Sequence, residues 1–143
     1  GEGLSLDESV YVAKLLAEAG LDAIELSGGL LTGGKWSPSR PGIDSPEKEA
    51  YFAEHAARFK QEVDLPLILV GGIRSLGMAK DIVRREIADY VSLSRPLIRE
   101  PDLVKRWKEG DDRPAECISD NKCFKPAMQG QGIYCTSKEE ENS

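Results

Sequence analysis

The chain has 143 residues, of which 40% are hydrophobic and 31% charged, and its formal net charge at pH 7 is -6. This length and balance fit one soluble domain with a real core, and no apolar run reaches the roughly 18 residues that a membrane helix needs. The negative charge argues against nucleic acid as the main partner, because binding its phosphates requires a clustered basic face.

The first third of the chain predicts one helix and one strand. Ser5 and Glu8 have the spacing of a capping box, so a helix begins after Ser5, and Gly20 is a good residue to end it. A short strand follows over residues 23–27. The connection over residues 28–44 is rich in Gly, Ser and Pro and is longer than most loops of α/β proteins.

A second cycle of helix and strand begins at Ser45-Pro46, a cap followed by a first-turn proline, and its apolar residues keep helical spacing to residue 63. Residues 67–70 form a continuous apolar run, which predicts a strand covered on both faces. Ser75 then caps the next helix.

A third cycle completes the regular part of the chain. Residues 89–93 predict a strand, and a last helix begins at Pro101 and ends at Gly110. The alternation predicts an α/β fold with a parallel sheet, although three strands are too few for a closed barrel. We therefore expect an α/β domain over residues 1–110 and an irregular segment over residues 111–143, which contains every cysteine.

Small residues end each of the three strands. Carboxyl ends of parallel strands are where α/β proteins bind ligands, and glycines there let backbone N–H groups approach a phosphate. The alternative is that these glycines only make tight turns. Three such ends in succession favour the phosphate interpretation, and the residues are Ser27-Gly28-Gly29, Gly71-Gly72, and Ser94 before Arg95.

Three stretches resemble a known family: "DAIELSGG", "SPSRPGIDSPEKEAYFAEHAARFKQEVDLPLILVGGIRS" and "ADYVSLSRPLIREPDLVKRW". They are similar to the C-terminal part of the old yellow enzyme family, the FMN-dependent NADH:flavin oxidoreductases, over about residues 4–135. The resemblance implies strands six to eight of a (βα)8 TIM barrel, the half that binds the FMN phosphate.

The resemblance also assigns site residues. It implies that Gly71, Gly72, Ser94 and Arg95 hold the FMN phosphate, although the family usually has glycine where Ser94 stands. Ser27, Gly28 and Gly29 would lie on the substrate side.

The family's catalytic residues lie on earlier strands, so no catalytic residue is expected in this chain. The implied enzyme transfers a hydride from NAD(P)H through FMN to an electron-poor alkene or similar acceptor, and this piece should be inactive alone. Its expected partners are the missing N-terminal half of the barrel and further copies of itself, since a three-stranded sheet leaves open edges. Three clustered cysteines suit the reducing cytoplasm better than a disulfide framework.

The cysteine segment suggests a second site. Cys117, Asp120, Cys123 and Cys135 resemble the four-cysteine motif that holds a [4Fe–4S] cluster in the dienoyl-CoA reductase branch of the family. Asp120 stands near the position expected for the second cysteine of that motif. The gap from there to Cys123 is one residue shorter than in the usual pattern. The alternatives are a zinc site or no metal at all.

Two other functions remain open from the residues alone. The chain could be a non-catalytic phosphate-binding or interaction module, or a small metal or iron–sulfur protein. In the long loop, Lys35, Trp36 and Arg40 either face substrate or flavin at the barrel mouth or belong to a solvated loop.

Overall fold

The computed structural model describes residues 3–30 and 33–141, so the outer ends of the two expected segments lie outside the described residues. Two single-turn 3₁₀ helices, η1 (Gly34–Trp36) and η2 (Pro46–Lys48), lie in the first long connection. The other elements are α1 (Leu6–Glu18), β1 (Ile24–Leu26), α2 (Ala53–Glu62), β2 (Leu67–Val70), α3 (Leu76–Arg84), β3 (Tyr90–Ser92), α4 (Arg95–Arg99), α5 (Leu103–Lys108), α6 (Phe124–Met128) and α7 (Thr136–Glu141).

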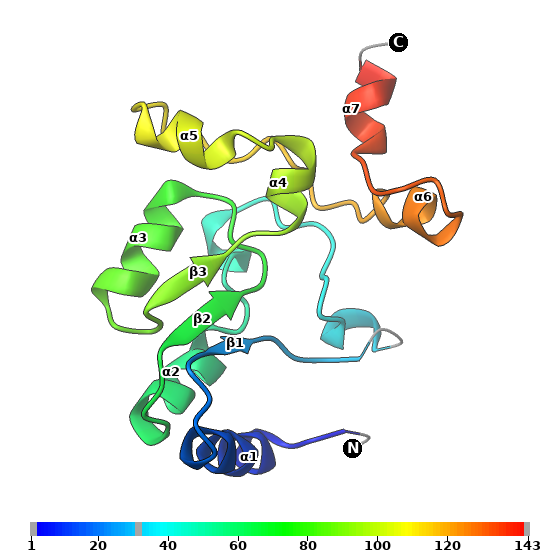
Figure 1. The fold of residues 1–143 in the computed structure, drawn as a ribbon. Helices are drawn as coiled ribbons and strands as arrows, with labels where there is room; N and C mark the ends of the chain where they lie inside the picture. Colours follow the sequence, from blue (N-terminus) through cyan, green and yellow to red (C-terminus); the bar gives the residue numbers. More distant parts are fainter. Residues whose placement is uncertain (1–2, 31–32, 142–143) are drawn as a thin grey trace.

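The three strands form one parallel sheet in the order β1-β2-β3, as Figure 1 shows. Ile24 pairs with Leu67, and Leu69 lies between Leu26 on one side and Val91 on the other. Each strand is followed by a helix, so the expected α/β architecture with a parallel sheet is confirmed.

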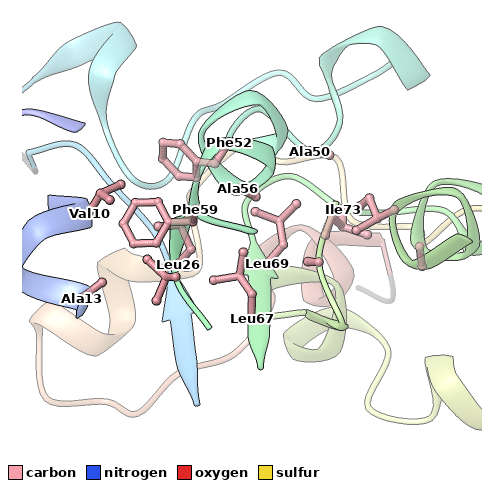
Figure 2. Packing of buried hydrophobic residues seen from close by; sticks show 14 residues of the cluster. Val10, Ala13, Leu26, Ala50, Phe52, Ala56, Phe59, Leu67, Leu69 and Ile73 are labelled. Carbon is pink, nitrogen blue, oxygen red and sulfur yellow. The ribbon is translucent and has the colours of Figure 1, made fainter. Parts of the chain in front are cut away.

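One hydrophobic core joins α1, α2 and α3 to a single face of the sheet. Figure 2 shows Phe52 and Phe59 close to Leu26 and Leu69, with Val10 of α1 beside them. Burying one such side chain contributes roughly 1.5–3 kcal/mol, so this packing is the main support of the fold.

The opposite face of the sheet is less covered, which corrects the expectation that β2 is covered on both faces. Leu67 and Leu69 are buried, whereas Ile68 and Val70 are only half-buried. On the adjoining strand Tyr90 is 61% exposed. A continuous apolar run predicts two covered faces only where a second layer exists, and the three core helices all pack on the first face.

Two of the three helix starts predicted from capping residues are confirmed. Ser5 and Glu8 form the predicted capping box, and Ser75 Oγ accepts from the Met78 N–H over 3.2 Å. The prediction that a helix begins at Ser45 is wrong, because only η2 forms there and α2 begins at Ala53.

Glu49 gives a tertiary reason for this interruption. Between η2 and α2 the chain turns through Ala50 with φ +48°, and the Glu49 carboxylate reaches the start of α3. Its Oε2 accepts from the N–H groups of Arg74 (2.8 Å) and Ser75 (3.0 Å). The break after η2 therefore supplies an acceptor for the N–H groups of the two residues that precede α3.

We call residues 3–110 of the described structure the α/β segment and residues 111–141 the tail. The tail was expected to be irregular, but it contains the short helices α6 and α7. A second hydrophobic cluster packs Ala115 of the tail against Leu103 and Trp107 of α5. None of the described helices has both the length and the apolar character needed to cross a membrane.

Candidate functional site

A pocket of about 330 Å³ lies at the carboxyl ends of the strands. The turn after β2 and the start of α4 form much of its wall, so the structure brings together residues that sequence reasoning selected from three separate stretches. The tail closes part of the pocket with Ser119 and Phe124, and Glu25 of β1 is a further lining residue. The predicted residues that line it are Ser27, Gly71, Gly72, Ser94 and Arg95.

Gly28 and Gly29 are not among the residues that line this pocket. They line a second, smaller pocket of about 210 Å³ together with Trp36, Arg40 and Phe52. The structure therefore places these two glycines in a different pocket from Gly71 and Gly72, whereas Ser27 lines both pockets.

The two glycines after β2 are required by the turn itself. Their φ angles are +131° for Gly71 and +72° for Gly72, in a region that side chains disfavour. A Cβ at Gly72 would lie 2.6 Å from Cε1 of Tyr51, and one at Gly71 would lie 2.8 Å from Cδ2 of Phe52. Turn geometry and close packing thus account for both glycines without any ligand.

Ser94 replaces the glycine of the family pattern without needing a left-handed backbone, since its φ is -116°. Ser94 and Arg95 both line the pocket. The turn and loop hydrogen bonds of the described residues include none from the backbone N–H groups of Gly71, Gly72, Ser94 or Arg95. These are the groups that could donate to an anion.

Arg95 is a buried cation with a neutral partner. Its residue is 8% exposed, and its Nη1 donates to Oδ1 of Asn121 over 2.6 Å. Among the described residues no carboxylate forms an ion pair with it. Arginine is rarely buried without a counter-charge, because transferring the charge from water is costly. The surroundings of Arg95 therefore suit an anionic ligand.

Arg74, the other arginine that follows a strand, has structural partners. Its Nη2 donates to the carbonyl of Ala115 over 2.7 Å, and its Nη1 donates to the carbonyl of Ile43. It thereby joins the loop before α2 to the tail. The two arginines that line the pocket differ in role, because the guanidinium of Arg74 is already engaged by backbone oxygens.

The long loop after β1 is fixed by contacts to the start of α2. The guanidinium of Arg40 lies 4.4 Å from the ring centroid of Tyr51 and 5.3 Å from that of Phe52, and Tyr51 Oη donates to the carbonyl of Pro38 over 2.8 Å. Trp36 is 62% exposed, with Lys35 Nζ 5.1 Å from its ring centroid. Arg40 lines the smaller pocket, away from Arg95.

The cysteine segment does not fit a metal cluster in this arrangement. All three cysteines are free thiols, and among the described residues no three His, Cys, Asp or Glu side chains are placed to hold a metal ion. Asp120 Oδ2 instead accepts from Ser137 Oγ over 2.7 Å, and Arg99 Nη1 lies 3.6 Å from Cys135 Sγ.

The buried thiol of Cys123 also differs from a good metal ligand in its pKa. Burial raises the pKa of the Cys123 thiol, and Cys117 beside it raises that pKa further. Metals bind the thiolate, so this shift disfavours the ligand form of Cys123. Among the described residues, the structure does not place Cys117, Asp120, Cys123 and Cys135 around one metal position.

Sequence reasoning missed the contribution of the tail to the pocket. Ser119, Asn121 and Phe124 come from a segment without periodicity, and no motif marks them as site residues. The positive φ of Asn121 (+62°) is a feature that asparagine tolerates, but a sequence alone does not reveal it.

Comparisons with known proteins agree with this architecture. The sequence model of the NADH:flavin oxidoreductase / NADH oxidase family matches residues 7–113. The chain is 30% identical to 4,4'-dithiodibutanoate disulfide reductase from Rhodococcus erythropolis, over 90% of this chain and 38% of that protein. It is 34% identical to an NADH oxidase from Thermoanaerobacter brockii, over 83% of this chain and 18% of that protein.

A solved old yellow enzyme homologue from Zymomonas mobilis has a similar fold, with a TM-score of 0.50 and 18% sequence identity. The likeness covers 78% of this chain and 28% of that one, so the chain spans only part of the length of its relatives. Since the family model covers most of the α/β segment, the chain belongs to the NADH:flavin oxidoreductase / NADH oxidase family, whose members depend on FMN and NADH.

Proposed function

We propose that this chain forms the phosphate-binding end of an FMN site in an NAD(P)H-dependent flavin oxidoreductase. In this proposal β1, β2 and β3 correspond to strands six, seven and eight of a TIM barrel. The observation that carries the proposal is Arg95, a buried guanidinium that has a neutral hydrogen-bond partner and faces a pocket of suitable size. A phosphate would supply the missing negative charge.

The residues of the chain fit the phosphate end of FMN better than the rest of it. The N–H groups of Gly72 and Ser94 would donate to phosphate oxygens, and Arg95 would provide a charged contact. Bound FMN would carry a hydride from NAD(P)H to the acceptor. Because the family's ring contacts and catalytic side chains lie on other strands, we expect the chain to bind FMN weakly and to be inactive alone.

The names of the relatives support hydride transfer through flavin but differ in the acceptor. One is a disulfide reductase and another an NADH oxidase, and a further relative, 30% identical over 85% of this chain and 18% of its own length, is a multifunctional alkene reductase/demethylase from Caballeronia cordobensis. The proposal is therefore limited to the cofactor and the class of reaction, and an electron-poor alkene is one acceptor of that class.

The first test is equilibrium dialysis of the chain against FMN. We expect no saturation at low micromolar FMN, because most of the cofactor's contacts are absent. Stoichiometric binding in that range would contradict the assignment of the remaining contacts to other strands.

The second test compares two arginines of the same pocket. Inorganic phosphate is titrated into the wild type, Arg95→Ala and Arg74→Ala, and the backbone amide signals of Gly72 and Ser94 are followed by NMR. We expect Arg95→Ala to weaken binding about tenfold, as the loss of a charged hydrogen bond implies, and Arg74→Ala to weaken it less. Equal affinity in the two variants would contradict the role of Arg95.

A further inference from the structure

The guanidinium of Arg95 is held by a side chain from the tail. Its Nη1 donates to Oδ1 of Asn121 over 2.6 Å, which is short for a hydrogen bond of this type. Arg95 is 8% exposed, so this contact lies inside the fold. A residue of the tail therefore directs the guanidinium of Arg95, for which the described residues provide no backbone acceptor.

Asn121 is itself fixed on both sides of its amide. Oδ1 also accepts from Ser39 Oγ over 3.0 Å, and Nδ2 donates to the carbonyl of Ser39 over 2.8 Å. A side-chain amide has one acceptor oxygen and one donor nitrogen, so these two bonds determine which edge of the amide faces Arg95. The loop after β1 thus sets the orientation of Asn121.

The backbone around Asn121 is held by further contacts that do not involve Arg95. Asn121 and Ser119 both have positive φ angles, +62° and +55°, and Ser119 is only 2% exposed. The N–H of Gly42 donates to the carbonyl of Ser119 over 3.0 Å, and the N–H of Phe124 donates to the carbonyl of Asn121 over 3.2 Å. The amide is therefore in place before any ligand binds.

We propose that Asn121 is a positioning residue for the phosphate site, a neutral acceptor that fixes the guanidinium of Arg95 and leaves its charge for the ligand. This inference rests on the proposed phosphate site. Arginine has five N–H donors in one plane, so a single bond to Oδ1 directs one edge of that plane and leaves other donors free. A carboxylate in the same place would form an ion pair with Arg95 and compete with phosphate.

The test uses the complete 143-residue chain and three variants. Asn121→Ala removes the acceptor, and Asn121→Asp keeps an acceptor but adds a negative charge. Gln129→Ala is the matched control, because this amide of the tail is exposed and its side chain makes no hydrogen bond among the described residues. Inorganic phosphate is titrated into each protein with the Gly72 and Ser94 amides as reporters, and thermal unfolding is measured in parallel.

We expect Asn121→Ala to weaken phosphate binding about fivefold and Asn121→Asp about tenfold or more, with no change in Gln129→Ala. The order of stability should be reversed at position 121, because aspartate retains the contact with Arg95 and alanine does not. A purely structural role would make the less stable variant the weaker binder, and that result would overturn the inference.

The wild type and Arg95→Ala separate failure of this inference from failure of the proposed function. If the wild type binds phosphate, Arg95→Ala weakens it and both Asn121 variants bind like the wild type, the positioning role is wrong and the phosphate site stands. If the wild-type chain gives no shift of the Gly72 and Ser94 amides up to high millimolar phosphate, both are wrong.

Discussion

The α/β segment and the tail are held together by different kinds of contact. In the α/β segment, helices and strands share one continuous apolar core. The tail is attached by a small apolar cluster around Ala115, by ion pairs and by hydrogen bonds, several of which join side chains of the α/β segment to its backbone. Arg74 Nη2 donates to the carbonyl of Ala115, Trp107 Nε1 donates to that of Arg113 over 3.0 Å, and Glu100 accepts from the Glu116 N–H over 2.5 Å.

The two kinds of contact differ in how well they tolerate the loss of one side chain. A core of many apolar side chains distributes its stabilisation, so the loss of one contact is partly compensated by its neighbours. A hydrogen bond from one buried side chain is lost entirely when that side chain is removed, and its backbone partner then lacks this contact. We therefore expect mutations to be tolerated differently in the two regions, and four experiments examine this contrast in order of decreasing expected effect.

The largest effect concerns the uncovered surfaces of the α/β segment. The exposed face of α1 carries Tyr11, Leu15 and Leu16, which are 63%, 46% and 44% exposed, and the second face of the sheet is only partly covered. Burying apolar surface contributes roughly 25 cal/mol per Å², so a few hundred Å² favour association by several kcal/mol before its entropic cost. We expect a dimer or larger assembly at micromolar concentration.

Light scattering behind a sizing column measures this association. The double substitution Leu15→Glu with Leu16→Glu should shift the chain towards monomer, whereas Glu18→Gln on the same helix should not. A folded wild-type monomer at this concentration would contradict the prediction.

The next effect concerns the tether made by Arg74. Arg74→Ala removes two hydrogen bonds to backbone carbonyls and leaves those carbonyls without this donor, so the free energy of unfolding should fall by about 2–3 kcal/mol. Denaturant unfolding followed by tryptophan fluorescence measures it, with Trp107 as the reporter next to the tail. Arg84→Ala is the control, since its side chain is 78% exposed and its ion pair contributes little. Similar losses in both variants would contradict the tether.

A smaller effect should appear at Asp89, at the amino end of the sheet. The N–H of Leu67 and then the ammonium of Lys60 hold the pKa of Asp89 below its usual 3.8. Because this pKa is lowered in the folded state, the stabilisation is present above about pH 4 and is lost as the pH falls through the lowered value. After screening by water at this partly exposed site, the effect should be about 1 kcal/mol or less.

Unfolding of the wild type and Asp89→Asn between pH 2 and pH 7 checks this prediction. The difference between the two proteins should shrink at low pH. Asp112→Asn serves as the control, because that exposed side chain makes no hydrogen bond among the described residues. A difference that is constant with pH would show that Asp89 acts only through packing.

The smallest expected change is in iron binding by the tail. Asp120→Cys restores a fourth thiol to the cysteine segment, but in this structure the thiols are not gathered around one point. Anaerobic purification followed by iron and sulfide analysis should therefore find no increase over the wild type. About four irons per chain in either protein would show that the tail rearranges to bind a cluster.

Local signals in the sequence determined most of the α/β segment. The capping box at Ser5, the apolar run over residues 67–70 and the cap at Ser75 each act within a few residues, so their structures follow from the chain itself. The start of α2 did not follow from Ser45, because Glu49 binds the N–H groups of Arg74 and Ser75, just before α3, across the fold. A contact of that range leaves no periodic mark in the sequence.

The candidate site divides in the same way. The sequence by itself determined that Gly71, Gly72, Ser94 and Arg95 lie where strands end, since strand order and turn residues place them there. Only the tertiary structure decided that Arg74 is engaged by backbone carbonyls while Arg95 keeps a neutral partner. The partners come from residues 26 to 41 positions away in the chain, and burial, which sets the cost of an unpaired charge, exists only once those distant segments have packed together.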